Sequence, residues 1–95
     1  MIVYAPRALR DLIGIEDYLK QRSPAGSRNV LAAIKAAIDD LERFPRIGIP
    51  IDAEGRRRLP LWQYPYLVFY RVSGPDIFIL HIRHGSRRPV MAEDL

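Results

Sequence analysis

Apolar residues recur at helical spacing in two stretches of the chain. In residues 7–22 the positions Ala8, Leu12, Ile15 and Leu19 form one stripe, which Leu9 and Ile13 widen on one side. A second stripe runs to Phe44 and stops at Pro45, which cannot continue a helix; its members are Val30, Leu31, Ile34, Ala37, Ile38 and Leu41. The turn residues 23–27 separate the stripes, with either Ser23 before Pro24 or Ser27 as the cap of the second helix. We therefore expect an antiparallel helical hairpin.

Strand patterns surround this hairpin. Residues 2–4 are short and β-branched, residues 57–62 suit an edge strand because of Pro60, and residues 66–72 and 77–83 are nearly continuous β formers around the turn 73–76. Residues 45–55 contain the prolines and glycines of a surface loop. The predicted fold is α+β, in the order β-α-α-β-β-β: a helical hairpin packed on a mainly antiparallel four-stranded sheet, with residues 1–95 as one domain.

Charge and composition narrow the possible chemistry. Among the 15 basic residues only Lys20 and Lys35 are lysine, and the net charge is +4. Arginine forks bind phosphate or carboxylate groups, so nucleic acid or an acidic protein is the expected kind of partner, with an ordinary solvated surface as the alternative. The absence of cysteine and the spacing of the two histidines argue against a metal. No secretion or membrane-spanning pattern occurs, so we expect a cytoplasmic protein without a membrane partner.

Four motifs follow one another along the chain, and together they resemble the toxins of the ParE/RelE superfamily. They are Ala8-x-x-Asp11-Leu12-x-x-Ile15-x-x-Tyr18-Leu19, Leu41-x-x-Phe44-Pro45-x-x-Gly48, Tyr66-x-Val68-x-Tyr70-Arg71-Val72 and Ile79-x-x-Ile82-x-His84-Gly85-x-Arg87. The resemblance implies a type II toxin that a cognate antitoxin neutralises in a hetero-oligomeric complex, with plasmid stabilisation as a possible role. No cofactor is implied.

The superfamily contains RNA-cleaving and gyrase-inhibiting branches. In RelE-like relatives an arginine on the central strand, a basic residue after the last strand and a C-terminal tyrosine do the cutting. The matching positions here are Leu67, Gly85 and Met91, so the resemblance favours the ParE-like branch, which inhibits DNA gyrase by binding. The target-binding residues are then Arg83, His84, Arg87 and Arg88. A solvated basic tail is the alternative interpretation of this segment.

Two alternatives to gyrase inhibition remain. The first is a ribosome-dependent mRNA endonuclease of the RelE type, in which His84, Arg83 and Arg87 would be the catalytic residues. The second is a non-toxic family member that binds only its antitoxin.

The antitoxin is expected on residues beside the first apolar stripe. Leu9, Ile13 and Tyr18 could form a groove for an amphipathic helix, although they could equally be peripheral core. We expect His81 to have a hydrogen-bonded packing role. Depending on the hairpin register, Arg71 and Arg83 share its sheet face, which would make that face a basic antitoxin or target surface and Arg71 another antitoxin-binding candidate.

Other residues have two interpretations each. The run 56–58 of three arginines could steer the protein to an acidic partner, but such runs are more often solvated. Trp62, Tyr64 and Tyr66 could stack on bases, but cross-strand packing is the more common role of aromatics on a hairpin.

Overall fold

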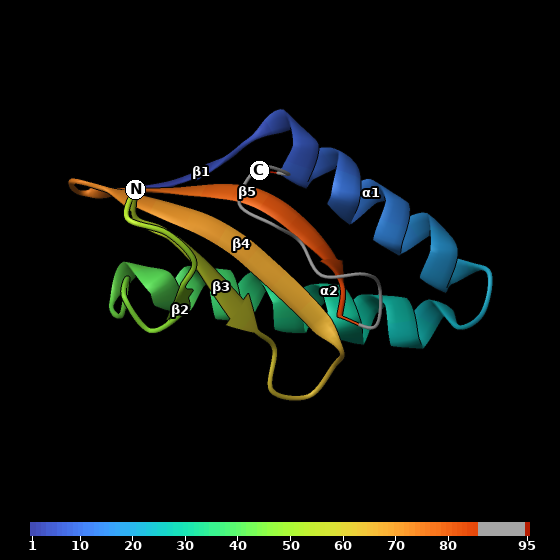
Figure 1. The fold of residues 1–95 in the computed structure, drawn as a ribbon. Coiled ribbons are helices and arrows are strands. Elements are labelled where there is room, and N and C mark those ends of the chain that lie inside the picture. Colours follow the sequence, from blue (N-terminus) through green and yellow to red (C-terminus); the bar gives the residue numbers. More distant parts are fainter. Residues whose placement is uncertain (86–94) are drawn as a thin grey trace.

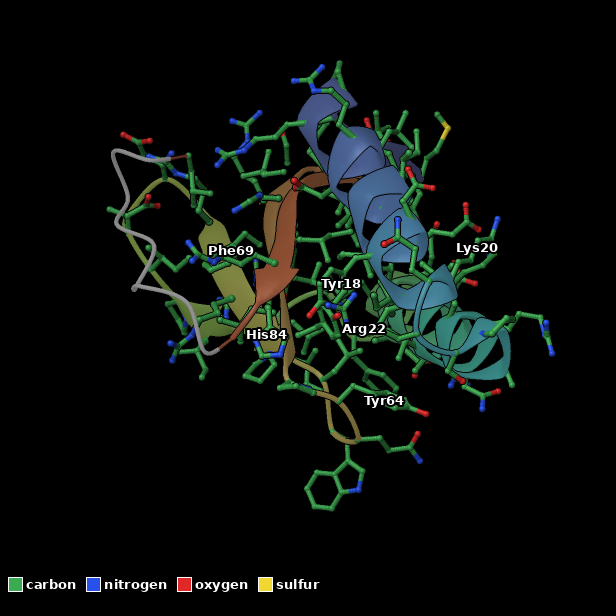
Figure 2. The ribbon with its side chains drawn as sticks, turned by 90° about the vertical axis from the view of Figure 1, so that its right-hand side faces the viewer. Tyr18, Lys20, Arg22, Tyr64, Phe69 and His84 are labelled. Carbon is green, nitrogen blue, oxygen red and sulfur yellow. The ribbon has the colours of Figure 1, made fainter. Side chains whose placement is uncertain are left out.

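The computed structural model describes residues 1–85 and 95, and these residues form a two-layer α+β fold. Both helices lie on one side of the sheet, as Figures 1 and 2 show from two directions. The elements are β1 (Ile2–Tyr4), α1 (Pro6–Lys20), α2 (Pro24–Asp39), a short 3₁₀ turn (Asp40–Glu42), β2 (Ile49–Pro50), β3 (Arg56–Pro60), β4 (Tyr66–Ser73) and β5 (Asp76–His84). The predicted α+β class and the helical hairpin are confirmed.

Local chemistry explains where the helices begin and end. Pro6 occupies the first turn of α1, where a missing N–H costs nothing. Ser23 caps α2, because its Oγ accepts a hydrogen bond from the N–H of Gly26 at 3.1 Å. Ser23, and not Ser27, is therefore the cap, and Ser27 is buried inside the helix. None of the helices in the described residues is long and apolar enough to cross a membrane.

The sheet has five strands in the order β1-β5-β4-β3-β2, so the prediction of four strands was wrong by one. The extra strand, β2, pairs Ile49 with Arg58 and Pro50 with Arg57 inside the segment that we expected to be a loop. A two-residue strand is too short to produce an alternating pattern, which is why the sequence did not indicate it. β1 is parallel to β5, and the other pairs are antiparallel.

The core lies between the helical hairpin and one face of the sheet. Tyr66, Val68 and Tyr70 of β4 alternate toward this face, and Ile34 and Ile38 of α2 are buried against it. Burying each of these two isoleucines contributes at most about 1.5–3 kcal/mol. The other buried core residues are Ala8, Val30, Leu41, Ile77, Ile79 and Ile82.

Tyr70 ties the end of the helical layer to the sheet. Its hydroxyl donates to the carbonyl of Pro45 at 2.8 Å and accepts from the N–H of Gly48 at 2.9 Å. A Cβ on Gly48 would lie 2.7 Å from that hydroxyl, so only glycine fits. This contact explains why glycine occupies position 48 of the Phe44-Pro45-x-x-Gly48 motif. Burial raises the pKa of Tyr70, which keeps the phenol protonated and able to donate.

Candidate functional site

Asp11 joins α1 to the open edge of β5. β1 pairs with β5 only as far as Ile79, and within residues 1–85 no other strand pairs with β5 on this side beyond that point. There the Oδ2 atom of Asp11 accepts the N–H of Ile82 at 2.9 Å and lies 2.7 Å from Nδ1 of His81. One carboxylate thus satisfies a strand-edge donor and fixes an imidazole.

His81 is enclosed by these contacts. It is 8% exposed, and its ring stacks on Phe69 with the centroids 5.7 Å apart. Asp11 lies at Nδ1, and the other ring nitrogen, Nε2, lies 3.5 Å from a guanidinium nitrogen of Arg7. The predicted hydrogen-bonded packing role of His81 is confirmed, and the partner, Asp11, was missed. A carboxylate beside the apolar stripe of α1 is the sequence signal that could have indicated it.

The sheet face away from the helices is basic, as the register shows. Arg83 is opposite Leu67, His81 is opposite Phe69, and Arg71 is opposite Phe78, so Arg71 and Arg83 share the face of His81 as expected. Phe69 points away from the helices in Figure 2. The guanidinium of Arg71 lies 5.5 Å from the centre of the Phe78 ring.

The three arginines of residues 56–58 differ in role. Arg56 forms an ion pair with Asp52 at 2.7 Å and another with Glu54 at 2.9 Å. Arg57, the next residue of β3, points to the opposite face of the sheet from Arg56. It donates to the carbonyls of residues 46 and 48 at 3.0 and 2.8 Å. Only Arg58 is an exposed side chain, so most of this run is structural and the prediction of a solvated run was wrong for two of its three residues.

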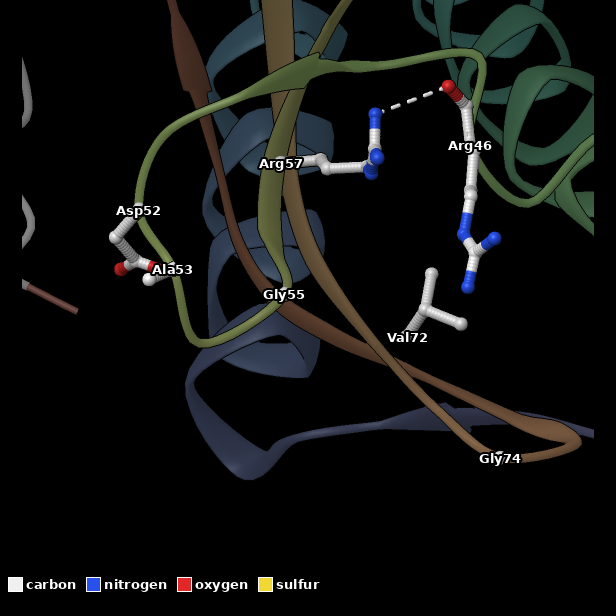
Figure 3. A pocket seen from close by; sticks show the side chains of 7 residues that line it. All are labelled: Arg46, Asp52, Ala53, Gly55, Arg57, Val72 and Gly74. Atoms are coloured by element: carbon white, nitrogen blue, oxygen red, sulfur yellow. Dashed lines mark hydrogen bonds between the residues drawn. The ribbon is translucent and has the colours of Figure 1, made fainter.

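Arg57 also lines a surface pocket. This pocket has a volume of about 480 Å³ and lies beside β3 and the β4–β5 turn. Figure 3 shows the guanidinium groups of Arg46 and Arg57 at its wall. The other lining residues are Asp52, Ala53, Gly55, Val72 and Gly74.

The predicted target-binding residues fall partly within the described chain. His84 lies at the end of β5, and its ring meets the Tyr66 ring edge-on, with the centroids 5.3 Å apart. Arg83 precedes it and is half-buried. Figure 2 shows His84, Tyr64, Tyr18 and Arg22 toward this end of the molecule. Arg87 and Arg88 lie outside the described residues.

The four predicted antitoxin-binding residues do not form one surface. Leu9 and Ile13 are 49% and 60% exposed and lie one turn apart on α1. Tyr18 lies about half a turn around the helix from Leu9 and packs against Arg22, whose guanidinium is 3.7 Å from the ring centre. Arg71 lies on the opposite face of the sheet from the helices.

Ile13 instead lines a cavity of about 260 Å³ between the two helices. Its wall is mostly apolar and rimmed by Glu16 and Lys35; the remaining lining residues are Tyr4, Leu12, Leu31, Ile34 and Ile38. Neither Leu9 nor Tyr18 contributes to this cavity. Residues 1–85 and 95 contain no cluster of three or more metal-ligating side chains.

The geometry defines a class of small α+β protein: a helical hairpin packed on a mainly antiparallel sheet whose other face is basic, with no metal cluster in residues 1–85 and 95. The family model of the ParE toxin of the type II toxin-antitoxin system parDE matches residues 2–89. The toxin RelE2 of Caulobacter vibrioides is 34% identical over 86 residues, which are 90% of this chain and 96% of that toxin. The chain belongs to the ParE toxin family, within the ParE/RelE superfamily.

Solved structures agree with this assignment. A chain of the chromosomal ParDE toxin-antitoxin system from P. aeruginosa superposes with a TM-score of 0.74 at 27% identity, covering 87% of this chain and 92% of that one. A chain of the toxin-antitoxin complex RelBE2 from Mycobacterium tuberculosis gives a TM-score of 0.61 at 26% identity, covering 88% and 95%. The protein is thus the toxin of a type II toxin-antitoxin system.

Proposed function

We propose that this toxin acts by binding DNA gyrase and that a cognate antitoxin neutralises it. The observation that carries the proposal is the chemistry at the end of β5. There the central strand presents Leu67 opposite Arg83. The resemblance to the superfamily matches Leu67 with the arginine of the RNA-cleaving branch. An aliphatic side chain can neither move a proton nor stabilise a phosphorane.

Among residues 1–85, the neighbouring side chains do not replace the missing group. Metal-free RNA cleavage needs a base and an acid placed on either side of the scissile phosphate. His84 is the one imidazole at this end of the described chain, and Tyr66, its ring neighbour, is buried in the core. A guanidinium such as that of Arg83 offers only N–H donors and no acceptor, so it cannot serve as the base. These features support inhibition by binding over cleavage.

The antitoxin is proposed to cover the outer surface of the helical hairpin. Leu9 and Ile13 present apolar side chains one turn apart, and Ile13 borders the cavity between the helices. An amphipathic helix buries apolar residues at this spacing. Both structural neighbours come from toxin-antitoxin systems, which supports such a partner. Binding to gyrase inside the cell would place the toxin in the cytoplasm.

The RelE-type nuclease is the second candidate, because the 34% identical relative bears the name RelE2 and His84 directly follows Arg83. Purified toxin is added in parallel to a gyrase supercoiling reaction and to ribosomes translating a defined message. We expect supercoiling to stop and the message to stay intact. Cleavage of the message by the wild-type toxin, lost in His84→Ala, would replace the proposal with the nuclease. Harmless overproduction in cells would indicate a non-toxic antitoxin binder.

A further inference from the structure

Trp62 is exposed in a way that packing does not explain. It lies in the loop between β3 and β4, residues 61–65, and 98% of its surface is accessible, the highest value among the large apolar side chains of the described chain. The predicted cross-strand packing is therefore wrong for Trp62, although it holds for Tyr66, which is buried. A free indole leaves a large apolar area in water, and tryptophan is enriched at protein interfaces, where its ring is buried and its N–H finds a partner.

The loop that carries Trp62 is fixed on both sides. The N–H of Leu61 donates to the carbonyl of Tyr66 at 3.0 Å, and the N–H of Tyr66 donates to the carbonyl of Tyr64 at 2.8 Å. The side chains of Leu61 and Tyr64 pack against the core. The indole is thus presented on an ordered support, which lowers the entropy that a partner must remove on binding.

The loop lies at the same end of the molecule as Arg83 and His84. The N–H of Gly85 donates to the carbonyl of Pro65 at 2.6 Å, which fastens the end of β5 to the loop. None of residues 61–65 lines the cavity between the helices. Trp62 is therefore outside the surface proposed for the antitoxin.

We propose that Trp62 is the anchor by which the toxin docks into an apolar pocket of its target protein, with acidic groups at the rim of that pocket facing Arg83. The inference rests on the proposed function, in which the toxin binds its target. Large aromatic side chains enclosed by a pocket dominate many protein interfaces. Arg83 has no acidic partner among residues 1–85 and 95, so its charge is available to complement an acidic rim.

A protein pocket fits Trp62 better than stacked bases do. Binding of single-stranded nucleic acid uses several exposed rings that hold successive bases along a basic groove. Tyr66, the first residue of β4, is buried, and Tyr64 in the loop is half-buried against the core. Trp62 is therefore the one fully exposed ring of the loop, and residues 61–66 do not form a stacking platform. A single protruding indole has both faces available, as insertion into a pocket requires.

The test uses the fact that the chain contains one tryptophan. Toxin labelled with 5-fluorotryptophan gives a single fluorine resonance from Trp62, which is followed while gyrase, the antitoxin encoded beside the toxin, or duplex and single-stranded oligonucleotides are added. We expect the resonance to shift and broaden with gyrase and to stay unchanged with the antitoxin and with the oligonucleotides. A shift with antitoxin or with oligonucleotides alone would assign the indole to that partner and overturn the proposal.

Variants give the second measurement. Trp62→Ala is expected to weaken gyrase binding at least tenfold and to abolish growth arrest. Its antitoxin affinity should stay within twofold of the wild-type value, and this retained affinity also shows that the variant is folded. Ile47→Ala, an exposed apolar residue outside the loop, is the matched control and should behave as wild type. Full growth arrest by Trp62→Ala would refute the anchor. If wild-type toxin arrests growth without affecting gyrase, only gyrase as the target is refuted. The role of Trp62 as an anchor is still tested, because the growth assay compares Trp62→Ala with the wild type.

Discussion

Gly48→Ala is expected to destabilise the toxin through one specific contact. The new Cβ would lie 2.7 Å from the Tyr70 hydroxyl, 2.8 Å from a ring carbon of Tyr70 and 3.0 Å from the carbonyl of Arg58. The buried ring and the strand backbone cannot move freely, so overpacking should cost about 1–3 kcal/mol. The backbone of Gly48 is not in the left-handed region, so steric contact is the whole cause.

Tyr70→Phe removes the hydroxyl and leaves the N–H of Gly48 and the carbonyl of Pro45 without their partner. Two lost hydrogen bonds should cost about 2 kcal/mol in total. In the double variant the clash at 2.7 Å disappears with the hydroxyl, so the combined loss should be about 1–2 kcal/mol smaller than the sum of the single losses.

The assay is urea unfolding followed by circular dichroism for the wild type, both single variants and the double variant. The urea curves give the loss in the free energy of unfolding directly. If the same variants are unfolded by heat, a loss of 2 kcal/mol in a domain of this size corresponds to a fall in melting temperature of about 8–16 °C. Gly14→Ala is the matched control: nothing lies within 4 Å of its Cβ, and the helix should gain roughly 0.5–1 kcal/mol. Strictly additive losses, or a neutral Gly48→Ala, would refute the reasoning.

Three further predictions follow from other contacts. Asp11→Ala should lower the free energy of unfolding by about 2–3 kcal/mol, measured in urea, because it leaves the N–H of Ile82 unpaired at the edge of β5. Partial burial raises the pKa of Asp52, but hydrogen bonds from two backbone N–H groups and from the Arg56 guanidinium outweigh it and hold the pKa below its usual value. The melting temperature should therefore fall as the pH drops through the folded-state pKa. Ile13→Asp should weaken antitoxin binding at least tenfold by calorimetry.

Each of these has a control and a result that would count against it. Asp11→Asn keeps an acceptor for the strand edge, and it should recover part of the stability; equal losses in both variants would contradict the proposed hydrogen bond. Asp52→Asn should flatten the acid limb of the stability curve, whereas Asp40→Asn, in an exposed ion pair, should leave it unchanged. Undiminished antitoxin affinity of Ile13→Asp would remove the helix surface from the antitoxin interface.

Periodicity predicted the parts of the fold that bury apolar side chains at regular spacing. The stripe from Ala8 to Leu19 and the alternation of Val68 with Tyr70 each specify which side faces the core, so both helices and the central hairpin were found. Features without a repeat were not predicted. β2 is only two residues long, so it shows no alternation. The register shift of β5 opposite Phe69 and Tyr70 could not be predicted either, because that stretch is a continuous run of β formers.

Site residues were harder to predict, because they depend on contacts between distant parts of the chain. Asp11 and His81 are 70 positions apart, and only the placement of α1 along the open edge of β5 brings them together. Tyr18 was predicted to form one groove with Leu9 and Ile13, but it lies on another side of α1 and its ring packs against Arg22. Trp62 sits where the pattern of strand residues continues, whereas β3 ends at Pro60 and the indole lies in the loop.

The central claim is that the toxin stops its target by occupying it, and the most direct measurement is the stoichiometry of inhibition. Relaxed plasmid is supercoiled by a fixed amount of gyrase while the toxin is raised from far below to above the gyrase concentration, with several incubation times at each ratio. The account predicts inhibition that follows the fraction of gyrase bound and does not grow with time. Complete inactivation by a small substoichiometric amount of toxin, progressing with time, would mean turnover and would contradict it.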